Sequence, residues 1–108
     1  MTPAWLRPQA ETDLIDTTRY YRGVGGDPLG ERFFDEALAS IGAAERMPGI
    51  GSPSIGEWCD IPGLRSWPIK RFPVRWYYFV VGDHLDVVRL LGDAQDLPEA
   101  LRETTTTE

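Results

Sequence analysis

The chain has 108 residues, of which 42% are hydrophobic and 26% are charged, and its formal net charge is -6. This length suits a single domain with one modest core. The negative charge argues against nonspecific binding of RNA or DNA by the chain alone, because such binding depends on lysine and arginine side chains that displace counterions from phosphates.

Cysteine usage and hydropathy indicate a cytoplasmic protein. Cys59 is the single cysteine, so it cannot form an internal disulfide, and this suits a reducing compartment. No apolar stretch approaches the roughly 20 residues that a membrane-spanning helix requires. The first residues also lack the basic and apolar regions of a signal peptide, so no membrane association is expected.

The N-terminal half predicts a short strand and a first helix. Residues 2–6 form the expected strand, and Pro8 follows at a position where its missing N–H costs nothing at the start of a helix. The helix is expected from about Pro8 to Arg22, because apolar residues recur at three- and four-residue spacing. A glycine-rich segment, residues 23–26, is expected to end it.

A second helix is marked more clearly at both ends. Asp27 can cap its N-terminus, Pro28 suits its first position, and Pro48-Gly49 closes it. Its expected buried face is made of Leu29, Phe33, Ala37, Ile41 and Ala44, widened by Phe34 and Leu38. Two amphipathic helices joined by a tight turn predict an antiparallel hairpin that packs on a sheet.

The C-terminal half changes from helical to extended periodicity. A glycine- and proline-rich loop is expected over residues 47–63, followed by strands over residues 64–72, 74–81 and 85–91. Pro68 cannot donate to a strand ladder, so its strand is expected at an edge or a bulge. The last two strands carry large apolar groups on both faces, which predicts that they are central and covered on both sides.

A short last helix is expected from Asp96, which can cap it, through Leu101. The threonine-rich tail, residues 104–108, has nothing to bury and is expected to be frayed. The chain therefore reads as one domain over residues 1–103 with a disordered tail over residues 104–108.

Catalytic and metal-binding chemistry is sparse. His84 is the single histidine and falls in an expected hairpin turn, and no group of side chains has the spacing of metal ligands. No Ser-His-Asp or Cys-His arrangement can be assembled. We therefore expect no metal, no cofactor and no catalytic residue.

The basic residues of the C-terminal half are the candidate contact positions. Arg65, Lys70, Arg71 and Arg75 lie within one short span, and Arg89 follows on the next strand, where all could approach one side of the sheet. Arginine donates through a planar fork and stacks on aromatic rings such as Trp67, which suits a protein interface or a nucleic-acid backbone. A second interpretation stays open, in which these residues are solubilising charges that flank apolar strands.

The aromatic strand over residues 74–79 also has two interpretations. In proteins that bind single strands, nucleic-acid bases stack on the aromatic side chains of such strands. Core packing is the more common explanation of an aromatic strand, because aromatic side chains bury a large area. We assign to the core Trp76, Tyr78, Val80, Val88 and Leu90.

The order of elements, together with a set of short motifs, resembles the ParE branch of the RelE/ParE toxins of bacterial type II toxin–antitoxin systems. The resemblance covers about residues 3–98. The motifs that carry it are Leu6-x-Pro8-x-Ala10-x-x-Asp13-Leu14, Tyr20-Tyr21, Phe33, Pro48-Gly49-x-Gly51, Pro62-Gly63-Leu64-Arg65-x-Trp67-Pro68, Phe72-Pro73, Tyr77-Tyr78, and Val87-Val88-Arg89-Leu90-Leu91 followed by Asp96.

The resemblance implies an α+β fold of the RelE/ParE type, with one N-terminal strand, a two-helix antiparallel hairpin, a three-stranded antiparallel meander and a short C-terminal helix. It implies a toxin that binds DNA gyrase and blocks growth until a ParD-like antitoxin neutralises it in a hetero-oligomer. An antitoxin segment that folds on contact would cover the second apolar face of the sheet. The positions expected to meet the target or the antitoxin are Arg65, Trp67, Lys70, Arg71, Arg75 and Arg89.

Two other functions are compatible with the same scaffold. A RelE-like ribosome-dependent mRNA endonuclease would need proton-transfer groups and cations for the developing phosphorane, and Arg65 and Arg89 could supply the cations. Gly92, however, stands where many relatives carry a histidine. A non-toxic relative that acts only in complex formation and operon repression is the other alternative.

Overall fold

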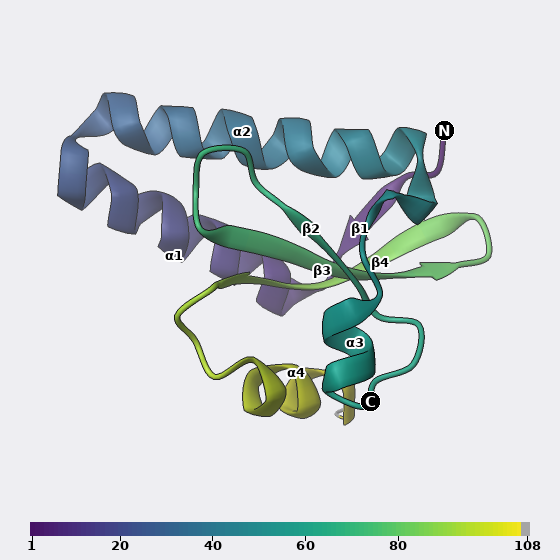
Figure 1. Ribbon diagram of the computed structural model, residues 1–108. Coiled ribbons are helices and arrows are strands. Elements are labelled where there is room, and N and C mark those ends of the chain that lie inside the picture. The colour runs from purple at the N-terminus through teal and green to yellow at the C-terminus, as the bar shows by residue number, and fades with distance from the viewer. Residues whose placement is uncertain (107–108) are drawn as a thin grey trace.

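The computed structural model describes residues 1–106, and it shows one four-stranded sheet with helices on both faces (Figure 1). The strands lie in the order β1-β4-β3-β2, with β1 parallel to β4 and the other pairs antiparallel. The α+β fold expected from the sequence is confirmed. The elements are β1 (Ala4–Leu6), α1 (Pro8–Gly25), α2 (Asp27–Arg46), the 3-10 helix η1 (Pro48–Ile50), α3 (Ser54–Trp58), β2 (Arg65–Pro68), β3 (Val74–Val81), β4 (His84–Gly92) and α4 (Leu97–Thr106).

The hairpin of α1 and α2 covers one face of the sheet. Ala10 and Leu14 are the buried residues of α1 that join its core, and α2 contributes Phe33, Ala37 and Ile41. The indole Nε1 of Trp76 donates to the carbonyl of Ala37 at 3.0 Å and ties β3 to α2. The antiparallel helix hairpin on one sheet face is therefore confirmed.

The meander places its two apolar strands in the centre, as expected. Strand β2 is an edge strand and ends at Pro68, where a missing N–H costs no ladder hydrogen bond. The pairing of β3 with β4 shifts register between Tyr77 and Tyr78, so Val88 lies opposite no residue. Such a bulge bends the strand and increases its twist.

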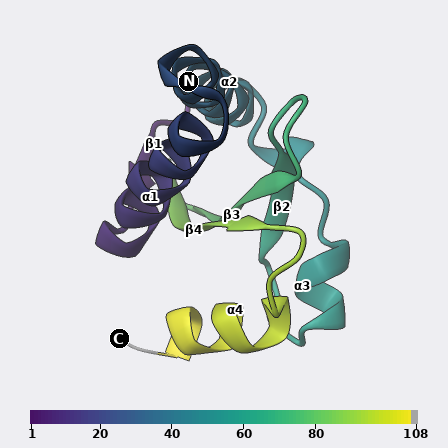
Figure 2. The same cartoon turned by 90° about the vertical axis from the view of Figure 1, so that its left-hand side faces the viewer.

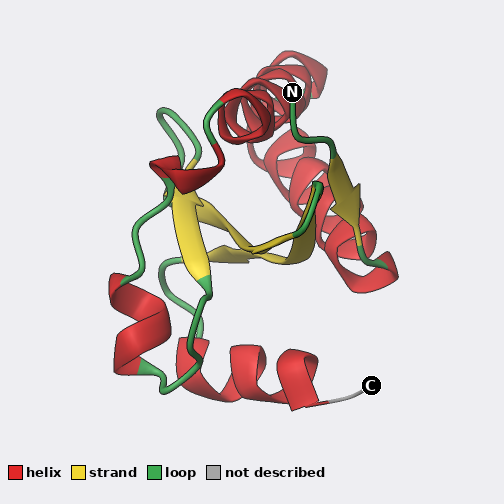
Figure 3. Cartoon of the chain, turned by 90° about the vertical axis from the view of Figure 1, so that its right-hand side faces the viewer, coloured by secondary structure: helices red, strands yellow, loops and turns green. Residues whose placement is uncertain are grey.

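The second face of the sheet is covered by α3 and α4 of the same chain, as Figures 2 and 3 show. The expectation that residues 47–63 form only a loop is wrong, because η1 and α3 lie within them. The expectation that an antitoxin segment covers this face is also wrong, because helices of the chain itself cover the centre of the face. The buried residues of this second core are Cys59, Ile61, Leu64, Tyr77, Val88, Leu91 and Leu101.

Three side chains expected in the core are exposed instead. Phe34 is 40%, Leu38 46% and Val80 45% accessible to solvent. Phe34 and Leu38 border the buried stripe of α2, and Val80 lies next to the turn between β3 and β4. The other core assignments, Trp76, Tyr78, Val88 and Leu90, are confirmed.

Several element boundaries differ from those expected. Helix α1 continues through Gly25, and β2 ends four residues earlier than expected, at Pro68. Helix α4 extends past Leu101 to Thr106, so it includes the first three residues of the segment expected to be frayed. Residues 107–108 of that segment lie outside the described residues. Across residues 1–106, no helix is both long enough and apolar enough to span a membrane.

Candidate protein-binding surface

Arg65 lies on the edge strand β2 and is engaged by its own chain. Its Nη1 donates to the carbonyl of Gly51 at 2.6 Å and to that of Gly49 at 3.3 Å. The guanidinium thereby holds the segment that follows α2 against the sheet. Trp67, two residues further along β2, is half-buried and packs against the core beneath the helix hairpin.

Arg89 is engaged by helix α1. Its Nε donates to Asp13 Oδ2 at 2.7 Å and its Nη2 to Asp13 Oδ1 at 3.1 Å. The Asp13 carboxylate also accepts from the backbone N–H of Leu90 at 3.0 Å. The two side chains are only 11% and 14% exposed. This bidentate pair fixes the C-terminal part of β4 to α1, so Arg89 has a structural role.

Arg75 does not share a side of the sheet with Arg65. Arg65 pairs with Tyr78 and Pro68 pairs with Arg75, and successive residues along a strand point to opposite faces. Arg75 donates to Ser66 Oγ at 3.2 Å and lies 3.9 Å from Asp93 Oδ1. The expectation that all five cations could approach one side of the sheet is therefore wrong.

Lys70 and Arg71 are the exposed members of the expected set. They lie in the loop between β2 and β3, which reaches α2 in Figure 1. Arg71 has a positive φ of 73°, and its Nη1 lies 3.2 Å from Glu36 Oε2 of α2. The hydroxyl of Ser40 donates to the carbonyl of Pro68 at 2.9 Å and fixes the loop at its other end.

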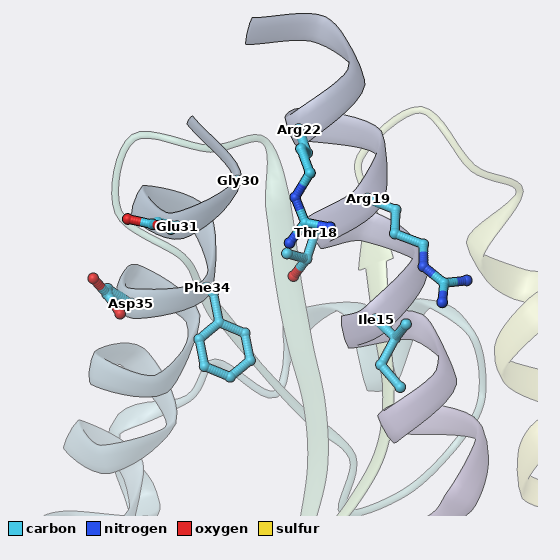
Figure 4. A pocket seen from close by; sticks show the side chains of 8 residues that line it. All are labelled: Ile15, Thr18, Arg19, Arg22, Gly30, Glu31, Phe34 and Asp35. Atoms are coloured by element: carbon cyan, nitrogen blue, oxygen red, sulfur yellow. The ribbon is translucent and has the colours of Figure 1, made fainter. Parts of the chain in front are cut away.

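A groove lies between α1 and α2 that the sequence pattern did not predict. Figure 4 shows the ring of Phe34 in the space between the two helices, with Ile15 across from it on α1. The groove has a volume of about 540 Å³, and Ile15 is 52% exposed within it. Gly30 permits the close helix contact, because a Cβ there would lie 3.1 Å from the Cβ of Arg22. The sequence signal that could have revealed the groove is the presence of large apolar residues beside the main buried stripe of each helix, Ile15 on α1 and Phe34 on α2.

The two walls of this groove differ in charge. Arg19 and Arg22 come from α1, whereas Glu31 and Asp35 come from α2 (Figure 4). An apolar floor with charged rims is the surface expected for an amphipathic helix laid into a groove. The groove is therefore a candidate protein-binding site.

His84 and Tyr78, two side chains that could transfer protons, are held by contacts within the chain. The His84 ring stacks on Trp5, with ring centroids 3.9 Å apart, and its Nδ1 lies 3.4 Å from Asp83 Oδ1. The Tyr78 hydroxyl donates to Pro48 O at 2.7 Å and accepts from Gly51 N–H at 3.0 Å, and burial raises the pKa of this phenol. No group of three or more His, Cys, Asp or Glu side chains suited to a metal ion occurs within the described part of the chain.

Comparison with known proteins agrees with this architecture. The family model described as the ParE toxin of type II toxin–antitoxin systems, parDE, matches residues 6–97. Among solved structures, the chain is similar to one from the chromosomal ParDE TA system of P. aeruginosa, with a TM-score of 0.73 and 19% sequence identity. The alignment covers 85% of this chain and 96% of that chain, which shows a shared fold. No curated protein matches the sequence.

The family match covers most of the chain, from the end of β1 to the start of α4. It includes the helix hairpin, the meander and every residue of the Arg89–Asp13 pair and the α1–α2 groove. The chain therefore belongs to the ParE family of toxins of type II toxin–antitoxin systems.

Proposed function

We propose that this toxin inhibits DNA gyrase by binding it, and that a ParD-like antitoxin neutralises the toxin in the cytoplasm by forming a hetero-oligomer. The family match over residues 6–97 carries this proposal. The solved relative comes from a ParDE system, which supports an antitoxin of the ParD type as the partner.

Inhibition by binding fits the side chains better than RNA cleavage does. A ribosome-dependent nuclease needs cations that are available to a developing phosphorane and groups that transfer protons. Arg89 is held by Asp13 and Arg65 by the carbonyls of Gly49 and Gly51. Gly92 supplies no side chain at the end of β4, and its N–H donates to Gln95 Oε1 at 2.7 Å. The proposal therefore assigns no catalytic residue.

The α1–α2 groove is the proposed binding site of the antitoxin. A ParD-like segment that folds on contact would place the apolar face of a helix over Ile15 and Phe34, which lie exposed in the groove. Lys70 and Arg71, in the loop beside α2, remain proposed contact positions for the antitoxin or the target. For Arg65, Trp67, Arg75 and Arg89 the proposed contribution is smaller, because their side chains are already packed or paired.

Inducible expression in bacteria that carry a reporter of DNA damage tests the proposed target. A gyrase inhibitor that traps cleaved DNA arrests growth and activates the reporter, whereas a ribosome-dependent nuclease arrests growth without such activation. Normal growth at full expression would instead support the non-toxic relative.

Co-expression with a ParD-like antitoxin tests the proposed partner. The antitoxin is expected to restore growth and to co-purify with the toxin. The substitution Phe34→Asp should weaken this complex about tenfold or more, because it puts a carboxylate on the apolar floor of the groove. Val24→Asp is the matched control, since Val24 is 63% exposed and does not line the groove.

A further inference from the structure

A second hollow lies on the other flank of α1, where β3 begins and β4 ends. It has a volume of about 560 Å³, and its walls come from the second half of α1, from Pro73 and Val74, and from the turn that follows Gly92. The hollow shares no lining residue with the α1–α2 groove.

The walls of this hollow are held in place by the fold. Asp93 N–H donates to the carbonyl of Pro73 at 2.9 Å, and Gln95 N–H donates to that of Gly92 at 3.2 Å, which closes the turn. The Tyr21 ring packs against Phe72, with centroids 4.8 Å apart. The hollow is therefore preformed and needs no ordering of its backbone when a ligand enters.

The charged groups of the hollow are carboxylates. Asp16 comes from α1 and Asp93 from the turn after β4, and no lysine or arginine is among its lining residues within the described chain. Arg75, which does not line the hollow, has its Nε 3.9 Å from Asp93 Oδ1 and offsets part of that one charge. Asp16 is exposed and has no ion pair with any described residue. The hollow therefore attracts a cation and repels a phosphate.

The remaining wall suits a planar cation with an aliphatic stem. Tyr20 is 63% exposed and lines the hollow beside Tyr21, to which its ring lies edge-on at 5.1 Å. A guanidinium stacks on such a ring and donates to carboxylates at its edges, while its methylene groups pack on Val74 and Pro73. Arginine meets these requirements better than lysine, whose ammonium does not stack.

We propose that this hollow receives an arginine side chain of the antitoxin, an inference that rests on the function proposed above. Helix α1 is the ridge between the two depressions: Ile15, Thr18 and Arg19 face the groove, while Asp16, Thr17 and Tyr20 face the hollow. A helix is roughly 10 Å across, and an extended chain advances about 3.3 Å per residue. An antitoxin segment that fills the groove thus reaches the hollow within a few residues.

Nuclear magnetic resonance titration of the full-length toxin tests the site without the antitoxin. The probe is the N-acetyl methylamide of arginine, and the matched control is the same derivative of citrulline, which has nearly the same shape and no charge. The arginine derivative should shift the amide signals of Asp16, Tyr20, Gly92 and Asp93 in a saturable way, and the citrulline derivative should not. Equal shifts with both derivatives, or no shifts, overturn the cation site.

Two variants connect the site to the antitoxin. Asp16→Asn removes a carboxylate without breaking an ion pair, and Asp16→Asn with Asp93→Asn removes both. Each should weaken arginine binding and antitoxin binding by at least about threefold, while Asp35→Asn, a carboxylate of the groove, leaves arginine binding unchanged. Lost arginine binding with unchanged antitoxin affinity overturns the proposed occupant. An antitoxin that does not bind the wild-type toxin at all overturns both this occupant and the proposed partner.

Discussion

The pair of Arg89 and Asp13 joins residues that lie 76 positions apart in the chain. Because both side chains are almost fully covered, removing one leaves a buried charge without its partner. Arg89→Ala should lower the free energy of unfolding by about 2–4 kcal/mol, measured by urea denaturation. Asp13→Asn should cost less, because the amide oxygen can still accept from Leu90 N–H.

Arg22→Ala is the control for this prediction. Arg22 lies 3.4 Å from Asp27, but the two side chains are 52% and 79% exposed. An exposed ion pair contributes little, so the loss should stay below about 0.5 kcal/mol. Equal losses for Arg89→Ala and Arg22→Ala would contradict the structural role of the Arg89–Asp13 pair.

Tyr77 and Tyr78 are neighbours whose buried hydroxyls have opposite surroundings. The Tyr77 hydroxyl has no hydrogen-bond partner within the described part of the chain. The Tyr78 hydroxyl makes two hydrogen bonds, one donated to Pro48 O and one accepted from Gly51 N–H. Tyr77→Phe should therefore raise the free energy of unfolding by about 1 kcal/mol, and Tyr78→Phe should lower it by about 1–3 kcal/mol. Urea denaturation of both variants checks the pair, and a loss of stability in Tyr77→Phe would contradict the assignment.

Tyr77 also predicts a dependence of stability on alkaline pH. Burial raises the pKa of Tyr77 to about 12, whereas an unfolded tyrosine titrates near 10. The folded state therefore holds this proton more tightly, so the stability is complete below about pH 10 and falls as the pH rises toward 12. By about pH 11 the loss from this group should be on the order of 1 kcal/mol, and Tyr77→Phe should lack that part of the loss. Identical alkaline profiles for the two proteins would count against the burial of this phenol.

Among the elements, α3 depends on a close contact at Gly56. A Cβ at this position would lie 2.5 Å from the carbonyl oxygen of Leu64 and 2.9 Å from that of Ile61. Gly56→Ala should lower the free energy of unfolding by about 1–3 kcal/mol, because backbone atoms must move to admit the methyl group. Thermal and urea denaturation provide the measurement.

Gly23→Ala is the matched substitution in α1. A Cβ at Gly23 would meet nothing within 4 Å, so the helix propensity of alanine should stabilise the protein by about 0.5–1 kcal/mol. The same chemical change is thus expected to act with opposite signs in the two helices. A stabilised Gly56→Ala variant would contradict the packing of α3 against the segment before β2.

The elements with a regular pattern could be predicted, and those made by tertiary contacts could not. The apolar spacing of α2 and the continuous apolar run of β3 appear directly in the sequence, and both lie close to their expected ranges. Helix α3 has five residues and sits between prolines and glycines, which are local signals of a loop. It forms because Ile55 and Cys59 bury against the sheet, a contact that local sequence does not display.

At the scale of the whole molecule, the strand positions of the basic residues could be predicted from the sequence, but their surroundings could not. Their positions on adjacent strands were predictable, but the side of the sheet depends on the register of β2 with β3. The partner of Arg89 lies on α1, far away in sequence, so its burial could not be predicted from neighbouring residues. Phe34 and Leu38 border the buried stripe of α2, and which bordering side chains α1 covers is decided by tertiary packing, which leaves both exposed.

The second face of the sheet is filled by α3 and α4, so the antitoxin is not needed to complete this core. The α1–α2 groove and the hollow beside it are the open surfaces that we propose for the antitoxin. This division between a self-sufficient core and open surfaces suits a toxin that must fold on its own and act on a target when the antitoxin is absent.

The central proposal, inhibition of gyrase by binding, is tested most directly with purified components. The toxin is incubated with gyrase and supercoiled plasmid, and in parallel with translating ribosomes and a reporter mRNA. We predict plasmid cleaved by gyrase after protein denaturation, with intact mRNA in the ribosomal reaction. Intact plasmid together with mRNA cut in the ribosome would contradict the account.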